Sequence, residues 1–183
     1  MKKLLISAIA VLMIALTFAS CYDPYAGIKD KSKKPTAATQ SSTKKKDETK
    51  KKKVSDKKYD DNLNGLRDFM KDSGYIKVED NNVTKMQADL IGAKKGNKYV
   101  DGDTRVELYE YDLKKADETR DKTIESVKND GSFTLYGETI PAYLSDSGKY
   151  LMVYTNPAAN DKNSDAYKIK QNAIKAFKGF KAK

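Results

Sequence analysis

The stretch from Tyr22 to Lys58 most constrains what this chain can fold into, because it contains few apolar side chains. Lys, Ser, Thr and Asp dominate it, and its 13 basic and 5 acidic residues give a net charge of +8. Such a segment cannot bury enough apolar surface to offset the entropy that it would lose on ordering. We therefore expect residues 22–58 to be a disordered linker and residues 59–183 to form one domain.

The excess positive charge of the chain lies entirely before this expected domain. The whole chain carries a formal charge of +10, whereas residues 59–183 contain 21 basic and 21 acidic side chains. A basic domain that neutralises phosphates would need a local excess of Lys and Arg. The charge distribution therefore predicts no nucleic-acid partner for the domain.

The first 20 residues have the pattern of a secretory signal peptide. Lys2 and Lys3 precede an apolar run from Leu4 to Phe18, and the small residues Ala19 and Ser20 follow it. A retained membrane-spanning helix is the alternative, but the run of 15 residues is shorter than the roughly 20 that span a bilayer. We predict a signal peptide over residues 1–20.

The sequence FASC, which ends at Cys21, resembles the lipobox of bacterial lipoproteins. Phe18 stands where the lipobox usually has Leu, and a small residue precedes the cysteine as the motif requires. The resemblance implies that Cys21 is diacylated on its thiol and becomes the mature N-terminus, on the extracytoplasmic face of the cell membrane. An ordinary signal peptide followed by an incidental cysteine remains the alternative.

The run KKKDETKKKK, from Lys44 to Lys53, leaves three interpretations open. It is a solvated spacer, a segment that contacts anionic lipid or wall polymers close to the anchor, or a nucleic-acid contact. The last interpretation is weakened because no aromatic residue lies between Tyr25 and Tyr59 to stack on bases.

The absence of histidine and the single cysteine exclude several kinds of chemistry. The chain has no Ser-His-Asp or Cys-His system, no Cys/His zinc site and no intramolecular disulfide. Acid and base catalysis within the domain would fall to Asp, Glu, Lys or Tyr. We expect no cofactor and no metal.

Residues 59–183 alternate between helical and extended hydrophobic patterns, with hairpin turns at Asp101-Gly102 and at residues 145–148. This order predicts an α+β domain with a largely antiparallel sheet of four to six short strands and helices on one face. The helices are expected over 59–73, 83–93, 113–130 and 164–180. The strands are expected over 75–78, in two runs on either side of Asp101-Gly102 within 98–112, and over 133–136, 140–144 and 150–154.

Two pairs of carboxylates are candidate sites by their spacing. Asp101 and Asp103 in VDGDTR are spaced as in a calcium loop, but the remaining ligands of an EF-hand are missing. A hairpin turn explains the presence of these two aspartates equally well. Glu107 and Glu110 are three residues apart on one expected strand, so they face opposite sides of the sheet. We interpret them as solvated side chains and not as a catalytic pair.

Tyrosine is the most unusual component of the domain. Tyr109 and Tyr111 share one face of a strand, and Tyr150 and Tyr154 share one face of the strand that we expect at the centre of the sheet. Packing in the core is one interpretation of these four residues. An exposed platform of rings that recognises a sugar or a peptide is the other.

The domain also resembles small uncharacterised lipoproteins of low-GC Gram-positive bacteria, in the stretches Gly92–Asp112, Gly148–Tyr154 and Ala173–Phe180. The resemblance implies no activity and assigns no residue a role. Together these features predict a lipid-anchored lipoprotein with a non-catalytic binding or accessory domain, whose partner is a protein, a peptide or a wall polymer. A hydrolase or transferase of the cell envelope that uses Asp, Glu, Tyr or Lys is the alternative.

Overall fold

A computed structural model describes residues 54–182 of the chain. The predicted signal peptide, Cys21 and the Lys44–Lys53 run lie outside these described residues. The helices are α1 (Leu63–Asp72), α2 (Glu118–Asp130) and α3 (Asp165–Lys178), with the short 3₁₀ helices η1 (Asp56–Lys58), η2 (Ala88–Ile91) and η3 (Pro157–Asn160). The strands are β1 (Val83–Lys85), β2 (Lys95–Asp101), β3 (Thr104–Glu110), β4 (Ser132–Leu135), β5 (Glu138–Pro141), β6 (Tyr143–Leu144) and β7 (Tyr150–Thr155).

Five strands form an antiparallel sheet in the order β1-β2-β3-β7-β6, and β4 and β5 form a separate hairpin. The prediction of an α+β domain with a largely antiparallel sheet is confirmed. β7 lies between β3 and β6, and five of its six residues are buried. The expectation that this apolar strand is internal is therefore also confirmed.

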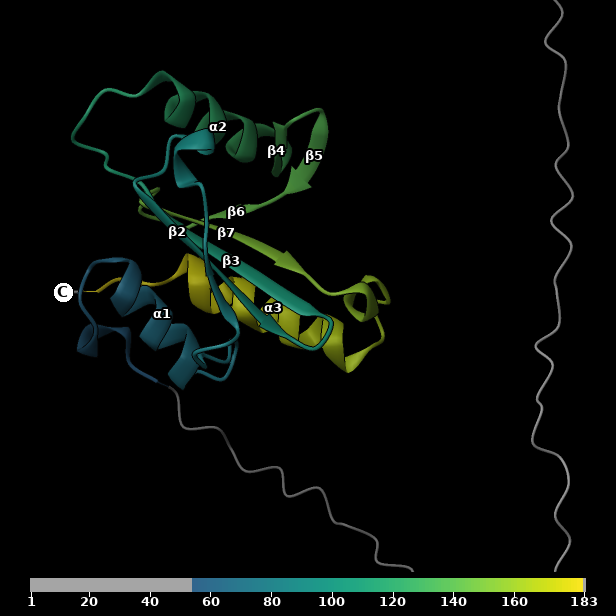
Figure 1. Cartoon of the computed structure of the whole chain (residues 1–183). Coiled ribbons are helices and arrows are strands. Elements are labelled where there is room, and N and C mark those ends of the chain that lie inside the picture. Colours follow the sequence, from purple (N-terminus) through teal and green to yellow (C-terminus); the bar gives the residue numbers. More distant parts are fainter. Residues whose placement is uncertain (1–53, 183) are drawn as a thin grey trace, which may run out of the picture. The chain divides into compact units, whose positions relative to one another are not determined.

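Helices cover both faces of the sheet, so the expectation that they cover one face is wrong. α1 and α3 lie on one side, and α2 with the β4–β5 hairpin lies on the other (Figure 1). The reason lies in the central strands, where side chains of both parities are apolar: Leu108 and Met152 join the core under α1 and α3, whereas Tyr109 and Leu151 join the core under α2.

Local signals in the sequence place most element ends correctly. The side chain of Ser164 accepts a hydrogen bond from the Tyr167 amide and caps α3, as predicted. Asp101 pairs with Thr104 across the predicted two-residue turn between β2 and β3. The turn at residues 145–148 joins β6 to β7.

Four predicted elements differ in the structure. The strand expected over 140–144 is divided between β5 and β6, which belong to different sheets. The helix expected over 83–93 is instead β1 followed by η2, because Val83 to Lys85 pair with the neighbouring strand β2. The segment 75–78 forms no strand and pairs with none. α2 begins only at Glu118, since Asp117 caps it, so Leu113 and Ala116 lie outside the helix and are exposed.

Residues 54–58, which the sequence assigned to the linker, belong to the folded domain. The side chain of Val54 packs against the core under α1 and α3. The Asp56 carboxylate accepts a hydrogen bond of 2.9 Å from the Lys181 amide, close to the C-terminus. The two ends of the described chain therefore meet at one edge of the domain.

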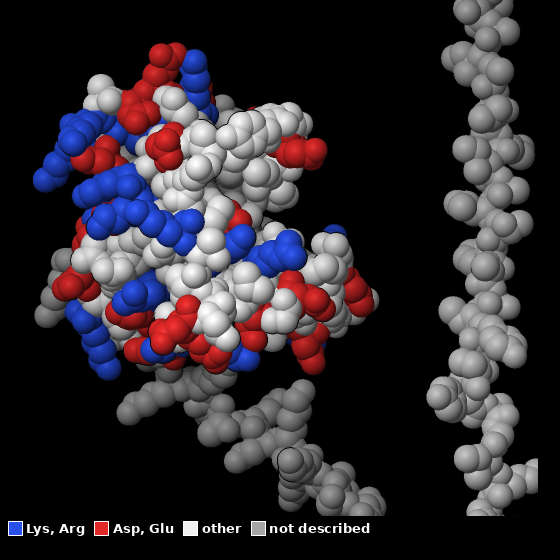
Figure 2. Space-filling model, viewed as in Figure 1, with Lys and Arg blue, Asp and Glu red and all other residues white. Residues whose placement is uncertain are grey.

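Acidic and basic side chains are interspersed over much of the face shown in Figure 2, whereas the area over the β4–β5 hairpin is largely uncharged. This mixture agrees with the balanced charge of residues 59–183. Within residues 54–182, no helix has the length and hydrophobicity needed to cross a membrane.

Candidate functional site

The four tyrosines proposed as a recognition surface lie in the core. Tyr109 and Tyr154 are each 5% exposed, and Tyr111 and Tyr150 are each 1% exposed. They occupy opposite faces of the sheet, Tyr109 and Tyr111 under α2, and Tyr150 and Tyr154 under α1 and α3. The interpretation as an open platform of rings is therefore wrong, because helices cover both faces.

The hydroxyl groups of two of these tyrosines form hydrogen bonds inside the domain. Tyr109 donates a hydrogen bond of 2.7 Å to Glu107, and Tyr150 donates one of 2.7 Å to Asp61. Burial, followed by these hydrogen bonds to carboxylates, raises the pKa of both tyrosines above its ordinary value. Both hydroxyls therefore stay protonated at neutral pH and donate hydrogen bonds to fixed partners. They are poorly suited to act as bases.

The two glutamates of β3 face opposite sides of the sheet, as the sequence predicted, but Glu110 is not solvated. It is 7% exposed, and its carboxylate accepts a hydrogen bond of 3.0 Å from the amide of Leu63, the first residue of α1. A carboxylate at this position satisfies a free helix N–H and interacts favourably with the helix dipole. Sequence alone gave no sign of this, because the two residues are 47 positions apart.

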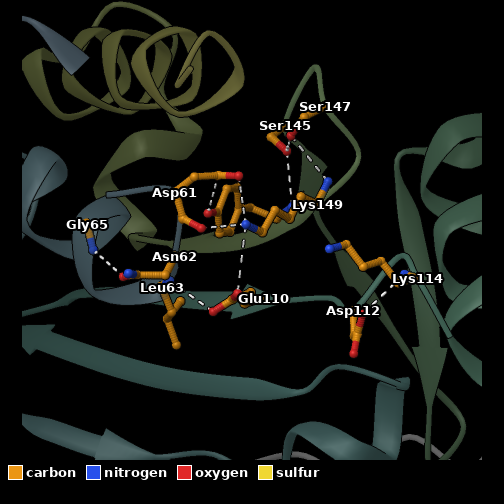
Figure 3. Close-up of polar contacts among 11 residues, drawn as sticks. Asp61, Asn62, Leu63, Gly65, Glu110, Asp112, Lys114, Ser145, Ser147 and Lys149 are labelled. Carbon is orange, nitrogen blue, oxygen red and sulfur yellow. Dashed lines mark hydrogen bonds and ion pairs between the residues drawn. The ribbon is translucent and has the colours of Figure 1, made fainter. Parts of the chain in front are cut away.

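Glu110 belongs to a polar cluster that we call the Lys149 cluster, formed by Asp61, Leu63, Glu110, Lys149 and Tyr150 (Figure 3). The Lys149 ammonium lies 2.8 Å from the Asp61 carboxylate and 4.0 Å from that of Glu110. Burial works to raise the pKa of Asp61, but the hydrogen bonds from Lys149 and Tyr150 outweigh it and lower the pKa. The cluster joins the start of α1 to the ends of β3 and β7.

This cluster has the groups of an acid-base site but the geometry of a structural clamp. A lysine that acts as a base or nucleophile must be neutral, whereas the Nζ of Lys149 contacts two carboxylates and also donates to the Asp61 carbonyl. The nearby hydroxyl of Ser145 accepts from the amide of Tyr150 and pairs with Ser147. None of the three carboxylate or ammonium groups lines the grooves described below.

The clamp makes a prediction about stability. Replacing Glu110 with Gln should lower the free energy of unfolding by about 1–2 kcal/mol, because the charge-assisted bond to the Leu63 amide is lost. Glu125 is exposed on α2, so Glu125→Gln is the matched control and should change it by less than about 0.5 kcal/mol. Urea unfolding measures both variants, and equal stabilities would contradict the assignment of Glu110 to the clamp.

The calcium-loop alternative receives no support from the geometry. Asp101 forms an ion pair of 2.7 Å with Lys77, and Asp103 lies in the tight turn between β2 and β3. Among residues 54–182, no three acidic or cysteine side chains gather closely enough to hold a metal ion. The hairpin interpretation of these aspartates agrees with the structure.

The concave surface of the domain lies elsewhere, around the segment that follows α1. A groove of about 840 Å³ runs between α1 and α3, with Phe69 and Ala176 among its apolar walls and Asp72 and Lys175 among its polar ones. A second groove of about 520 Å³ lies between the segment Gly74–Glu79 and the sheet. Gly74 and Tyr75 line both grooves, so the two grooves adjoin at these residues.

These grooves are the candidate functional site, and the sequence reasoning missed them. Their walls come from α1, α3, the segment after α1 and the β2–β3 hairpin, which are far apart in the chain. Ile169 of α3, which is 49% exposed, is an apolar side chain of the second groove that lies open to solvent. Comparison of the chain with protein-family models, with curated proteins and with solved structures finds no match.

Proposed function

We propose that this chain is a lipoprotein anchored to the cell membrane through Cys21, with its domain on the extracytoplasmic side acting as a non-catalytic binding module. The signal-like residues 1–20 and the cysteine that directly follows them support the anchor. The linker left between Cys21 and the domain, residues 22–53, has 32 residues and a typical end-to-end distance of roughly 30 Å, so the domain would search a volume close to the membrane surface.

The observation that carries the binding role is the pair of grooves that adjoin at Gly74 and Tyr75. Their walls combine apolar and charged side chains, as binding sites usually do. The acidic and basic groups of the Lys149 cluster are meanwhile engaged with one another and lie outside the grooves. Because the grooves and the acid-base groups of the Lys149 cluster lie in different places, the arrangement favours recognition over catalysis.

The anchor is tested by replacing Cys21 with Ala. We expect the variant to lose incorporation of labelled palmitate completely and to leave the membrane fraction, because the thiol that carries the lipid is gone. Tyr25→Ala changes a nearby residue outside the lipobox and should keep both properties. Unchanged labelling of Cys21→Ala would refute the lipoprotein assignment.

The binding role is tested by placing a photo-crosslinking amino acid at Tyr75, where the grooves meet. Irradiation of intact cells should join the domain to one discrete protein or wall polymer. A crosslinker at Leu113, which is 48% exposed and lies outside the grooves, is the control. Identical products from the two positions would show that the grooves are not a binding site.

A further inference from the structure

The segment Tyr75–Val78 belongs to no helix and to no sheet. Its side chains alternate: Ile76 is buried, Lys77 is exposed and Val78 is half-buried. This alternation is the pattern of a strand with one face on a core. The sequence predicted a strand here, and the structure shows the alternating burial without a partner strand.

The backbone of this segment is fixed at its ends and open in its middle. The Tyr75 amide donates to the carbonyl of Met70, and the Glu79 amide donates to the side chain of Asn82. Among the described residues, the N–H and C=O groups of Ile76 and Val78 have no hydrogen-bond partner. An extended segment with such unpaired groups is a template for another strand.

A contact of Lys77 bears on the direction of the unpaired N–H and C=O groups of Ile76 and Val78. Its carbonyl accepts a hydrogen bond of 3.1 Å from the side chain of Asn82. In an extended strand, the backbone groups of successive residues point to opposite edges. With an extended backbone over this segment, the groups of Ile76 and Val78 point away from Asn82, along one common edge.

A groove beside this segment offers apolar pockets for side chains. The groove of about 520 Å³ is lined by Val106 and Tyr154 of the sheet, by Ile169 of α3 and by Ile76 and Val78. Ile169 is 49% exposed, so much of its apolar surface is in contact with solvent in the free domain. Apolar side chains at alternate positions of an added strand would contact this wall.

The charged side chains that line the groove balance one another. Lys71 and Lys77 line it together with Glu79 and Asp101, and Lys77 pairs with Asp101 at 2.7 Å. Two positive and two negative groups give no net attraction for a polyanion such as a phosphate-containing wall polymer. Unpaired amides beside an apolar wall match a polypeptide better.

We infer that the Tyr75–Val78 segment binds an extended peptide of a partner protein by strand addition. The inference rests on the proposed binding role and specifies its ligand. The N–H and C=O groups of Ile76 and Val78 pair with the peptide backbone, and its apolar side chains at alternate positions pack against Ile169 and the sheet.

The test selects a displayed library of random ten-residue peptides against the full chain purified in detergent. We expect enriched peptides with apolar residues at alternate positions. Ile169→Lys should weaken their binding by at least about tenfold, since it puts a charge on the apolar wall. The control Leu113→Lys makes the same change at a residue that is 48% exposed outside the groove, and should bind as the unchanged protein does.

Amide hydrogen exchange locates the pairing on the backbone. Binding of an enriched peptide should slow exchange at Ile76 and Val78 by at least about tenfold and leave Lys77, which faces the other edge, unchanged. No enrichment, equal binding by Ile169→Lys, or unchanged exchange at Ile76 and Val78 would overturn the inference. A discrete product from the Tyr75 crosslinker on cells together with any of these results would leave the binding role standing and reject strand addition alone.

Discussion

Replacing Gly92 with Ala is expected to lower the free energy of unfolding by at least about 4 kcal/mol. Gly92 ends η2 with a φ of +68°, a backbone conformation that side chains disfavour. A Cβ at this position would also lie 2.6 Å from the Cα of Arg120 in α2. Because the obstacle is helix backbone, η2 and α2 would have to separate, and part of the core under α2 would open.

Gly131 provides a control that separates the two causes. It ends α2 with the same φ of +68°, but a Cβ there would meet no atom within 4 Å. Gly131→Ala should therefore cost only the backbone strain, about 1–2 kcal/mol. Urea unfolding of the two variants measures the difference, and equal losses of stability would show that η2 and α2 are not held as closely as the structure has them.

The domain should unfold cooperatively between about pH 11 and pH 12 because of its buried tyrosines. Burial raises the pKa of five tyrosines that are at most 5% exposed: Tyr99, Tyr109, Tyr111, Tyr150 and Tyr154. The unfolded chain releases these protons near the ordinary pKa of 10.0, whereas the folded domain retains them. The stabilisation is therefore complete below pH 10 and is lost as the pH rises further.

The size of this effect follows from proton linkage. Each retained proton costs about 1.4 kcal/mol per pH unit, so five cost about 7 kcal/mol per pH unit once the unfolded tyrosines are ionised. Tyrosinate absorbance and far-ultraviolet circular dichroism should change together. Tyr111→Phe removes a buried hydroxyl that has no partner among residues 54–182, and should reduce the slope by one proton. Ionisation of all tyrosines before any loss of structure would contradict the prediction.

The elements that the sequence predicted correctly are those whose signals are local. The hairpin signal at Asp101-Gly102, where the turn itself is Gly102-Asp103, the Ser164 cap and the Gly131 stop each act within a few residues of the element that they bound. The consecutive apolar residues Leu151 and Met152 face opposite sides of the sheet, and this likewise identified an internal strand from adjacent residues. Such features could be predicted because neighbouring side chains and backbone determine them.

The wrong predictions depend on distant partners. Val83 to Lys85 form a strand only because β2 lies beside them, and Tyr75–Val78 remain unpaired because no strand of the described domain reaches them. The tyrosines illustrate the same limit at the level of function. Their parity showed which residues share a face, but whether a helix covers that face depends on how α2 and α3 return to the sheet.

The sequence by itself determined the α+β composition, the antiparallel sheet, the concentration of excess charge before residue 59 and the exclusion of histidine and disulfide chemistry. Only the tertiary structure decided that both faces of the sheet are covered, that Glu110 and Lys149 hold the start of α1, and that grooves flank a segment that pairs with no strand. The physical reason is range. Propensity, parity and charge act along the chain, whereas burial, ion pairing and concavity arise between residues that only folding brings together.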